Sequence, residues 1–231
     1  MSELNRVPIG VKQLDDMLRG GLPQGGLYLI AGGPGVGKTI LGAAFLYFGA
    51  TRYGEPGLYV TFNERADSFK AFMSTLNWDF QRLEDMGKIS IIDFMVTRER
   101  GLDTTMTLLI EKAKTLNAKR LVLDSVSALA IALKDKVDSR VLTSILHRQL
   151  RSLNCTSLMI AETPWGSDTI GSGVEEFVAD GIILLETVTE RAEIRKRLTI
   201  LKMRGTDFDP RYYRYVITKD LGFSLIPFPE A

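Results

Sequence analysis

Cysteine and histidine are each present only once in this chain of 231 residues. The single cysteine, Cys155, excludes an intrachain disulfide, and the apolar stretch Thr156–Ala161 beside it favours a buried, inert thiol over a nucleophile. The single histidine, His147, gives little support to a metal site built from histidines or to a hydrolase triad. Enzyme classes that depend on these two residue types are therefore poorly supported.

Long hydrophobic runs are also missing, because the longest apolar segments have only the length of a strand. The sequence therefore predicts no transmembrane helix. The opening segment, Met1–Pro8, is polar and does not have the apolar centre of a signal peptide. Together these observations predict a cytoplasmic protein with no membrane partner.

Charge is nearly balanced, with 29 lysines and arginines against 28 aspartates and glutamates. Any nucleic-acid site would have to be a local patch or be built by assembly. The chain is 45% hydrophobic and 25% charged, which is typical of a globular protein. No linker, repeat or low-complexity run interrupts it, so we expect a single domain over residues 1–231.

Glycine is concentrated in one short segment that reads Gly32-Gly33-Pro34-Gly35-Val36-Gly37-Lys38-Thr39. Its spacing of glycine, four residues, glycine, lysine and threonine fits a phosphate-binding loop, although a chance glycine-rich turn is the alternative. Glycines let backbone N–H groups point at a polyphosphate, the lysine reaches the β- and γ-phosphates, and the threonine hydroxyl completes a Mg²⁺ shell. The residues expected to bind the nucleotide are Gly33, Pro34, Gly35, Val36, Gly37, Lys38, Thr39 and Ile40.

Helical and strand patterns alternate along the first two-thirds of the chain, and strand patterns follow one another after that. The predicted helices are Val11–Leu18, Thr39–Tyr53, Ala66–Thr75, Asp79–Met86, Thr104–Leu116 and Asp138–Leu153. The predicted strands are Leu27–Ala31, Gly57–Phe62, Ile89–Asp93, Arg120–Asp124, Thr156–Ala161, Asp180–Val188, Ile194–Met203, Tyr212–Thr218 and Phe223–Ile226. This order predicts an α/β core, with a mostly parallel sheet that finishes in antiparallel strands.

Two acidic residues follow apolar strands. Asp124 ends the strand Arg120–Asp124, where a carboxylate beside a phosphate loop can hold Mg²⁺ through water; the alternative is an aspartate that only begins a turn. Glu64 comes shortly after the strand Gly57–Phe62 and is the best candidate to orient and polarise the water that attacks a phosphate. Its alternative role is an acid at a helix N-terminus, favoured by the helix dipole.

A pair of cations ends another predicted strand. Lys202 and Arg204 alternate with Met203, so their side chains share one face. Two such cations could meet a γ-phosphate, including one bound to a neighbouring subunit. The alternative is a solvated basic strand end.

Segments from Ile9–Pro23 to Leu201–Thr206 resemble, in the same order, those of KaiC-like ATPases of the RecA superfamily. The stretch Ile9–Pro23 is similar to the lead-in of KaiC-like and RadA-like proteins. The further similar segments are Asn77–Asp79, Val122–Ser125, Gly173–Asp180 and Leu201–Thr206. The resemblance covers essentially the whole chain, and the last two segments are far more specific to the family than the phosphate loop.

The resemblance implies a RecA-type core with helices on both faces of the sheet, and assembly into a ring or filament with Mg²⁺-ATP between subunits. It implies that the acid at Glu64 or at the position before it serves hydrolysis. It also implies that Lys202 and Arg204 reach the γ-phosphate of the neighbour. Selectivity for adenine comes from the resemblance alone.

The chain departs from KaiC-like domains at one site residue. Two adjacent glutamates are common after this strand, but the first of them is Asn63 here. An amide can orient water but cannot accept a proton as a carboxylate does, so slow hydrolysis becomes an expectation. Only about ten residues precede the shared lead-in, which fits a single-domain KaiC-like protein or RadA paralogue of archaeal type better than a complete recombinase.

Three roles follow from these observations. The first, which we favour on sequence, is a DNA-repair accessory that binds single-stranded DNA and modulates a RadA-type recombinase. The alternatives are a KaiC-like signalling ATPase and a slow nucleotide-dependent switch, both without DNA binding. For DNA, Trp165 could stack on a base, and the alternative is packing against its own domain. The basic candidates, which could equally be solvated faces, are Arg191, Arg195, Lys196 and Arg197, then Arg140, His147, Arg148 and Arg151, and more weakly Arg98 and Arg100.

Overall fold

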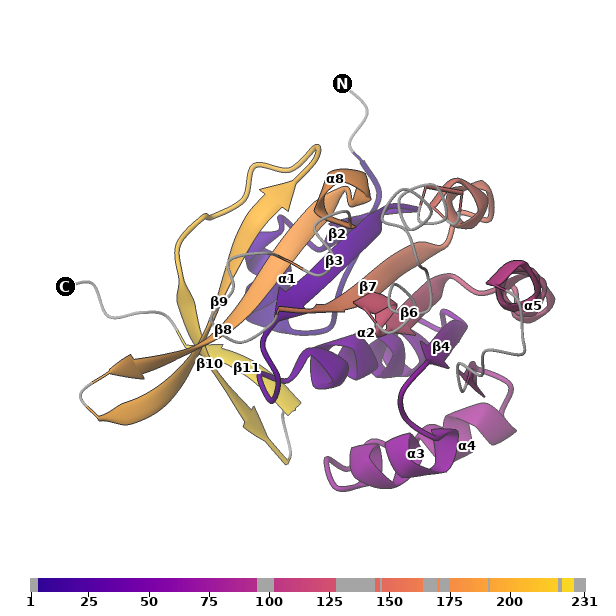
Figure 1. The fold of residues 1–231 in the computed structure, drawn as a ribbon, viewed down its shortest axis with the longest axis horizontal. Helices are drawn as coiled ribbons and strands as arrows, with labels where there is room; N and C mark the ends of the chain where they lie inside the picture. Colours follow the sequence, from indigo (N-terminus) through magenta and orange to yellow (C-terminus); the bar gives the residue numbers. More distant parts are fainter. Residues whose placement is uncertain are drawn as a thin grey trace.

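The protein builds one large sheet with helices on both of its faces (Figure 1). The computed structural model describes residues 4–94, 102–127, 144–145, 147–163, 170, 175–190, 192–219 and 222–226. Within these ranges the large sheet has nine strands, and a separate ribbon pairs β1 (Arg6–Val7) with β2 (Leu22–Pro23).

Most of the sheet is parallel. The parallel strands, in spatial order, are β8 (Gly181–Glu190), β3 (Leu27–Gly32), β7 (Thr156–Glu162), β6 (Arg120–Asp124), β4 (Gly57–Thr61) and β5 (Ile89–Asp93). Every residue of β3 and β4 is buried, which explains their continuous apolar runs, because helices cover both faces of a parallel sheet.

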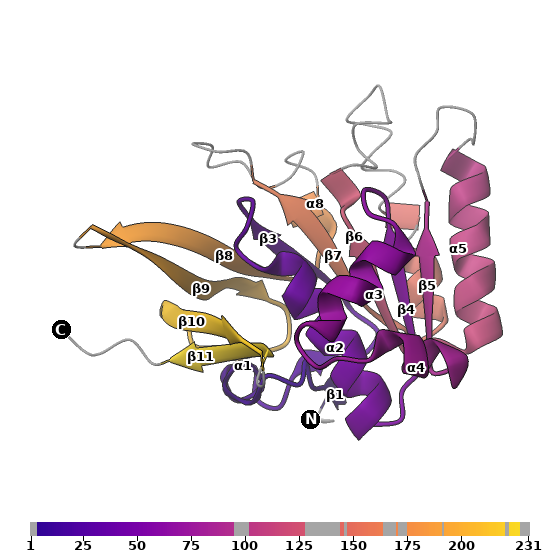
Figure 2. The ribbon, with the colours of Figure 1, turned by 90° about the horizontal axis from the view of Figure 1, so that it is seen from below.

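An antiparallel extension continues the sheet beyond β8. It consists of β9 (Glu193–Met203), β10 (Tyr213–Thr218) and β11 (Gly222–Ile226). Figure 2 shows the β8–β9 hairpin projecting away from the helical part of the molecule. The predicted α/β fold, with a mostly parallel sheet and an antiparallel C-terminal extension, is confirmed.

The helices divide between two hydrophobic clusters, one on each face of the sheet. Their bounds are α1 (Lys12–Met17), α2 (Lys38–Arg52), α3 (Ala66–Ser74), α4 (Phe80–Asp85), α5 (Leu102–Leu116) and α8 (Glu175–Val178). Phe45 of α2, Phe69 of α3 and Phe80 of α4 belong to one cluster. Leu109 and Ala113 of α5 belong to the other. None of the helices in the described ranges is both long and apolar enough to span a bilayer.

Predicted and observed elements agree to within one or two residues at their ends. The exceptions are β1, β2 and α8, which are too short to produce a periodic pattern. The predicted helix Asp138–Leu153 lies largely outside the described residues, and residues 147–152 within it are helical.

A buried arginine fixes the lead-in segment against the sheet. Arg120, at the start of β6, is fully buried, and its Nε lies 2.6 Å from a carboxylate oxygen of Glu55. Its Nη1 donates hydrogen bonds to the carbonyl oxygens of Pro8 at 2.7 Å and Phe45 at 2.8 Å. One guanidinium therefore joins the residue before the lead-in, α2 and β6. Helix α2 begins at the phosphate loop, and β6 ends at Asp124.

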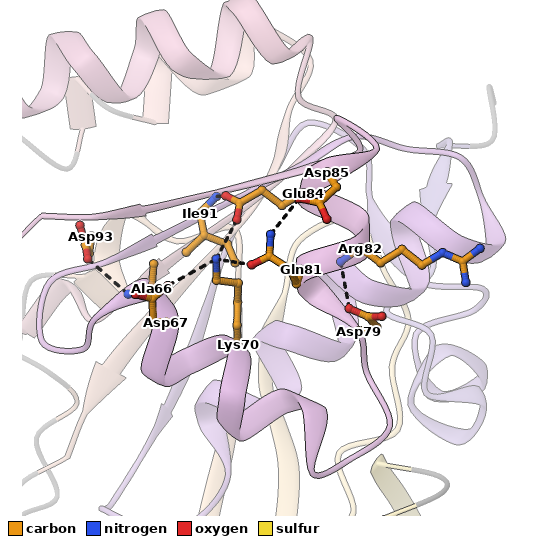
Figure 3. Close-up of polar contacts among 10 residues, drawn as sticks. All are labelled: Ala66, Asp67, Lys70, Asp79, Gln81, Arg82, Glu84, Asp85, Ile91 and Asp93. Carbon is orange, nitrogen blue, oxygen red and sulfur yellow. Dashed lines mark hydrogen bonds and ion pairs between the residues drawn. The ribbon is translucent and has the colours of Figure 1, made fainter.

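A polar network holds α3 and α4 on the edge strand β5 (Figure 3). The Lys70 ammonium lies 2.8 Å from Oε1 of Gln81 and 3.0 Å from Oε2 of Glu84. The other oxygen of Glu84 accepts the backbone N–H of Ile91 at 3.3 Å. These contacts hold α3, which begins directly after the loop that carries Asn63 and Glu64.

Candidate functional site

The phosphate loop connects the end of β3 to the start of α2. Gly35 and Gly37 have φ angles of +72° and +99°, a region that side chains with a Cβ rarely adopt. A Cβ on Gly37 would lie 2.5 Å from Cδ1 of Ile217 in β10. The loop therefore needs glycine here both for its turn and for its close contact with the antiparallel extension.

The residues expected to bind the nucleotide lie along this loop and the first turn of α2. The exposed ones are Pro34 and Gly35, the half-buried ones are Gly33, Gly37 and Thr39, and the buried ones are Val36, Lys38 and Ile40. The Ile40 side chain belongs to the hydrophobic core, so a contact with nucleotide could come only from its backbone.

Lys38 lies inside the loop and is 8% exposed. Its ammonium donates hydrogen bonds to the carbonyl oxygens of Gly32 at 2.9 Å and Gly33 at 2.7 Å. Burial lowers the pKa of Lys38, and the charges of Glu162 and Asp124 partly offset that effect. The chain thus holds a cation, surrounded by backbone dipoles, where a phosphate chain would run.

Glu162 is an acidic residue beside the phosphate loop that the sequence analysis did not single out. It ends β7 and stands opposite Gly32 in the register of β3 and β7, beside the phosphate loop. The sequence pattern could have indicated it, because Glu162 ends a buried apolar strand in the same way as Asp124 does.

Thr39, Asp124 and Tyr59 meet at one carboxylate oxygen. The hydroxyl of Thr39 and the phenol of Tyr59 each donate a hydrogen bond of 2.7 Å to Oδ2 of Asp124. The sequence analysis expected Thr39 and Asp124 to lie together, and the structure brings them into contact. It did not single out Tyr59.

Oxygen donors of this kind fit Mg²⁺. Among the described residues, no group of three or more histidine, cysteine, aspartate or glutamate side chains could hold a metal ion. Mg²⁺ typically takes one or two protein ligands and completes its octahedron with water and substrate phosphates. The pair formed by Thr39 and Asp124 matches that pattern.

The loop after β4 exposes the side chain of Asn63 to solvent and partly buries that of Glu64. The hydroxyl of Thr61 accepts the backbone N–H groups of Asn63 at 3.4 Å and Glu64 at 3.0 Å. Asn63 is exposed, whereas Glu64 is half-buried. Burial, and then the nearby charge of Asp124, raises the pKa of Glu64. The carboxyl of Glu64 therefore lies within electrostatic range of the Asp124 carboxylate.

Lys202 and Arg204 lie at the opposite end of the sheet from the phosphate loop. Lys202 pairs with Ile182 at the start of β8, and the adjoining Gly181 pairs with Tyr28 near the start of β3. The loop begins beyond Gly32, roughly 13 Å further along β3 at the usual rise of a strand. Neither cation therefore lies beside the phosphate loop of its own chain.

The same two cations have local partners. The ammonium of Lys202 donates to the carbonyl oxygen of Glu176 at 3.2 Å. Arg204 lies 3.3 Å from Oδ1 of Asp180, and its side chain remains 59% exposed. That exposure leaves the guanidinium accessible to a second molecule.

Some of the remaining basic candidates have acidic partners within their own chain. Arg195 pairs with Glu193, and Arg197 lies 3.1 Å from Glu186. Lys196 donates to the carbonyl oxygen of Gly35 at 2.9 Å. His147 lies 3.1 Å from Asp180, while Arg148 and Arg151 are exposed on their helix. The candidates Arg98, Arg100, Arg140, Trp165 and Arg191 lie outside the described residues.

Comparison with known proteins decides the family. The sequence model of the KaiC ATPase family matches residues 7–229. The chain belongs to the KaiC ATPase family.

Individual relatives of this KaiC-family chain support the same assignment to the family. It is 34% identical to the circadian clock oscillator protein KaiC of Parathermosynechococcus lividus over 98% of its length, but covers only 44% of that longer protein. It is 31% identical to a UPF0273 protein of Pyrococcus horikoshii, with 96% of this chain and 94% of the relative covered. The crystal structure of a KaiC-like protein of Pyrococcus horikoshii OT3 superposes with a TM-score of 0.88 at 35% identity, covering 97% and 100% of the two chains. The resemblance to KaiC-like ATPases is confirmed.

In this KaiC-family chain, Asp180 organises the end of the sheet that carries Arg204. Its carboxylate accepts the backbone N–H of Leu27 at 3.1 Å and also contacts His147 and Arg204. Burial alone would raise the pKa of Asp180, but these hydrogen bonds and charges outweigh it and lower the pKa to about 2.

We predict that Asp180→Asn removes a pH-dependent part of the stability. Because the folded pKa of Asp180 is lower than its unfolded value, this stabilisation is complete above about pH 5 and is lost as the pH falls toward 2. The variant should lose about 2 kcal/mol in free energy of unfolding at neutral pH and match the wild type near pH 2. Urea denaturation across this pH range measures the difference, and Asp16→Asn, at an exposed ion pair, is the control. If the free energy of unfolding of Asp180→Asn depends on pH as that of the wild type does, the lowered pKa of Asp180 is contradicted.

Proposed function

We propose that this chain binds Mg²⁺-ATP, hydrolyses it slowly as a homo-oligomer, and uses its nucleotide state to control binding to a partner. Lys38 and the backbone N–H groups of the loop hold the phosphates. Thr39 and Asp124 hold the metal, which neutralises charge on the phosphates when bound. Membership in an ATPase family and the contact of 2.7 Å between Thr39 and Asp124 support these assignments.

Slow turnover follows from the loop after β4. Glu64 is the group that orients the attacking water, because its carboxyl is half-buried within range of Asp124. Asn63 is exposed, with Nδ2 3.5 Å from Oγ of Ser125, and an amide cannot take a proton. Only one carboxylate is therefore available in this loop for the step that limits hydrolysis.

The observation that carries the oligomeric mechanism is the position of Lys202 and Arg204. They lie at the opposite end of the parallel strands from the phosphate loop of their own chain. Cations that cannot reach their own nucleotide can complete the site of a neighbouring copy. We therefore propose a ring or filament in which Arg204, with Lys202, contacts the γ-phosphate of ATP bound to the adjacent subunit.

The signalling and switch roles now have more support than the DNA-repair role. The relatives reported above are named as KaiC or as UPF0273 proteins, and none of these names refers to DNA repair. Among the described basic candidates, Arg195 and Arg197 are paired with glutamates, which reduces the positive potential offered to a phosphate backbone.

We predict that the ATPase rate does not respond to single-stranded DNA. The rate should be unchanged by DNA at every point of a salt series, because Arg195 and Arg197 of the hairpin are paired with glutamates. Steady-state phosphate release with and without an oligonucleotide measures this. DNA stimulation together with binding that weakens steeply with salt would instead support the repair role.

We predict that Lys38→Ala abolishes nucleotide binding and turnover. Loss of a charge-assisted bond of about 2–3 kcal/mol alone weakens affinity roughly 100-fold. Titration with a fluorescent ATP analogue measures affinity, and a melting curve without nucleotide shows whether the fold is kept. Lys12→Ala, at an exposed ion pair in α1, is the control and should bind as the wild type does. Wild-type affinity in Lys38→Ala would contradict the proposed phosphate site.

We predict that Arg204→Ala spares nucleotide binding but slows turnover by about 10³-fold, the typical contribution of an arginine that contacts the γ-phosphate. Arg211→Ala is the control, since Arg211 is an exposed arginine with a local partner, Asp209.

Mixing Arg204→Ala with Lys38→Ala tests action between subunits, because each variant supplies the residue that the other has lost. Activity should recover in the mixture, and no recovery would contradict a role in trans.

A further inference from the structure

Tyr59 has a buried ring that its neighbours hold in place. It lies in the middle of β4 and is 1% exposed. Its ring stacks on that of Phe69 in α3, with centroids 4.0 Å apart and an angle of 23° between the planes. Phe69 in turn contacts Phe80 of α4 edge to face, with centroids 5.1 Å apart. The phenol of Tyr59 is therefore aimed in one direction by packing of the core.

That direction is the carboxylate of Asp124. The Tyr59 hydroxyl donates to Oδ2 at 2.7 Å, and the Thr39 hydroxyl donates to the same oxygen at the same distance. Strands β4 and β6 are direct neighbours in the sheet, so the two backbones fix this contact as well. Two short donors on one oxygen leave the carboxylate little freedom to rotate.

A second buried tyrosine in this sheet, Tyr28, hydrogen-bonds outside the proposed metal site and serves for comparison. Tyr28 of β3 is also 1% exposed, and its hydroxyl donates to the backbone carbonyl oxygen of Pro23 at 2.6 Å. Burial of a tyrosine therefore requires a hydrogen-bond acceptor but not a carboxylate. Tyr59 differs in that its acceptor is the proposed metal-holding acid itself.

We propose that Tyr59 is a positioning residue for the metal site, orienting Asp124 toward Mg²⁺ while Thr39 presents its hydroxyl oxygen to the same ion. The proposal rests on the function proposed above. Groups that hydrogen-bond to metal-holding carboxylates fix their orientation, and removal of such a group typically weakens metal affinity or activity by roughly 10- to 100-fold. Tyr59 does not contact the nucleotide in this scheme, so its contribution depends on the metal.

The variant Tyr59→Phe tests this with the smallest possible change. It removes the hydroxyl and keeps the ring that stacks on Phe69. The matched control is Tyr28→Phe, which removes an equally buried hydroxyl from another strand of the same sheet. Three measurements apply to the full chain: Mn²⁺ affinity by electron paramagnetic resonance with a non-hydrolysable ATP analogue, affinity for that analogue without metal, and the melting temperature.

We expect Tyr59→Phe to weaken Mn²⁺ affinity roughly 10- to 100-fold and to leave metal-free affinity for the analogue unchanged. Tyr28→Phe should leave both affinities unchanged, even where it lowers the melting temperature as Tyr59→Phe does. Wild-type Mn²⁺ affinity in Tyr59→Phe, or an equal loss in Tyr28→Phe, would overturn the positioning role and leave the proposed function intact. A wild-type chain that binds neither the analogue nor Mn²⁺ would overturn the proposed function itself.

Discussion

The hydrogen bonds that converge on Asp124 are the contacts on which the rest of the site depends. They join Thr39 at the start of α2, Tyr59 in the middle of β4 and Asp124 at the end of β6. These contacts require β6 to lie beside β4 and α2 to pack across the sheet. The phosphate loop, the proposed metal pair and the loop of Glu64 then share one edge of the sheet, because parallel strands end together there.

The direction of the strands divides the proposed catalytic groups between two ends of the sheet. The parallel strands bring the phosphate loop and the acids to one edge, whereas β9 returns antiparallel and carries Lys202 to the other. On its way β9 passes the phosphate loop, where Lys196 contacts Gly35. In the mechanism proposed above, each end of these strands therefore carries part of a nucleotide site, and an oligomer would bring the two parts together.

Much of the fold could be predicted from sequence because the signals are local. Strands buried on both faces read as continuous apolar runs, and β6 was predicted with its observed bounds. The edge strand β5, which is only partly buried, was also predicted with its observed bounds. The glycines and lysine of the phosphate loop likewise act within a few residues of one another. The two-residue strands β1 and β2 gave no signal, because a pattern needs several residues to repeat.

The sequence by itself determined the chemistry of the loop, the family and the alternation of helices and strands. Only the tertiary structure decided which side chains share a partner: that Tyr59 meets a carboxylate while Tyr28 meets a carbonyl, and that Arg204 lies far from the loop of its own chain. The physical reason is the distance along the chain over which each kind of interaction acts. Propensity and loop chemistry act over a few residues, whereas contacts between strands depend on strand order and register, which packing of the whole core sets.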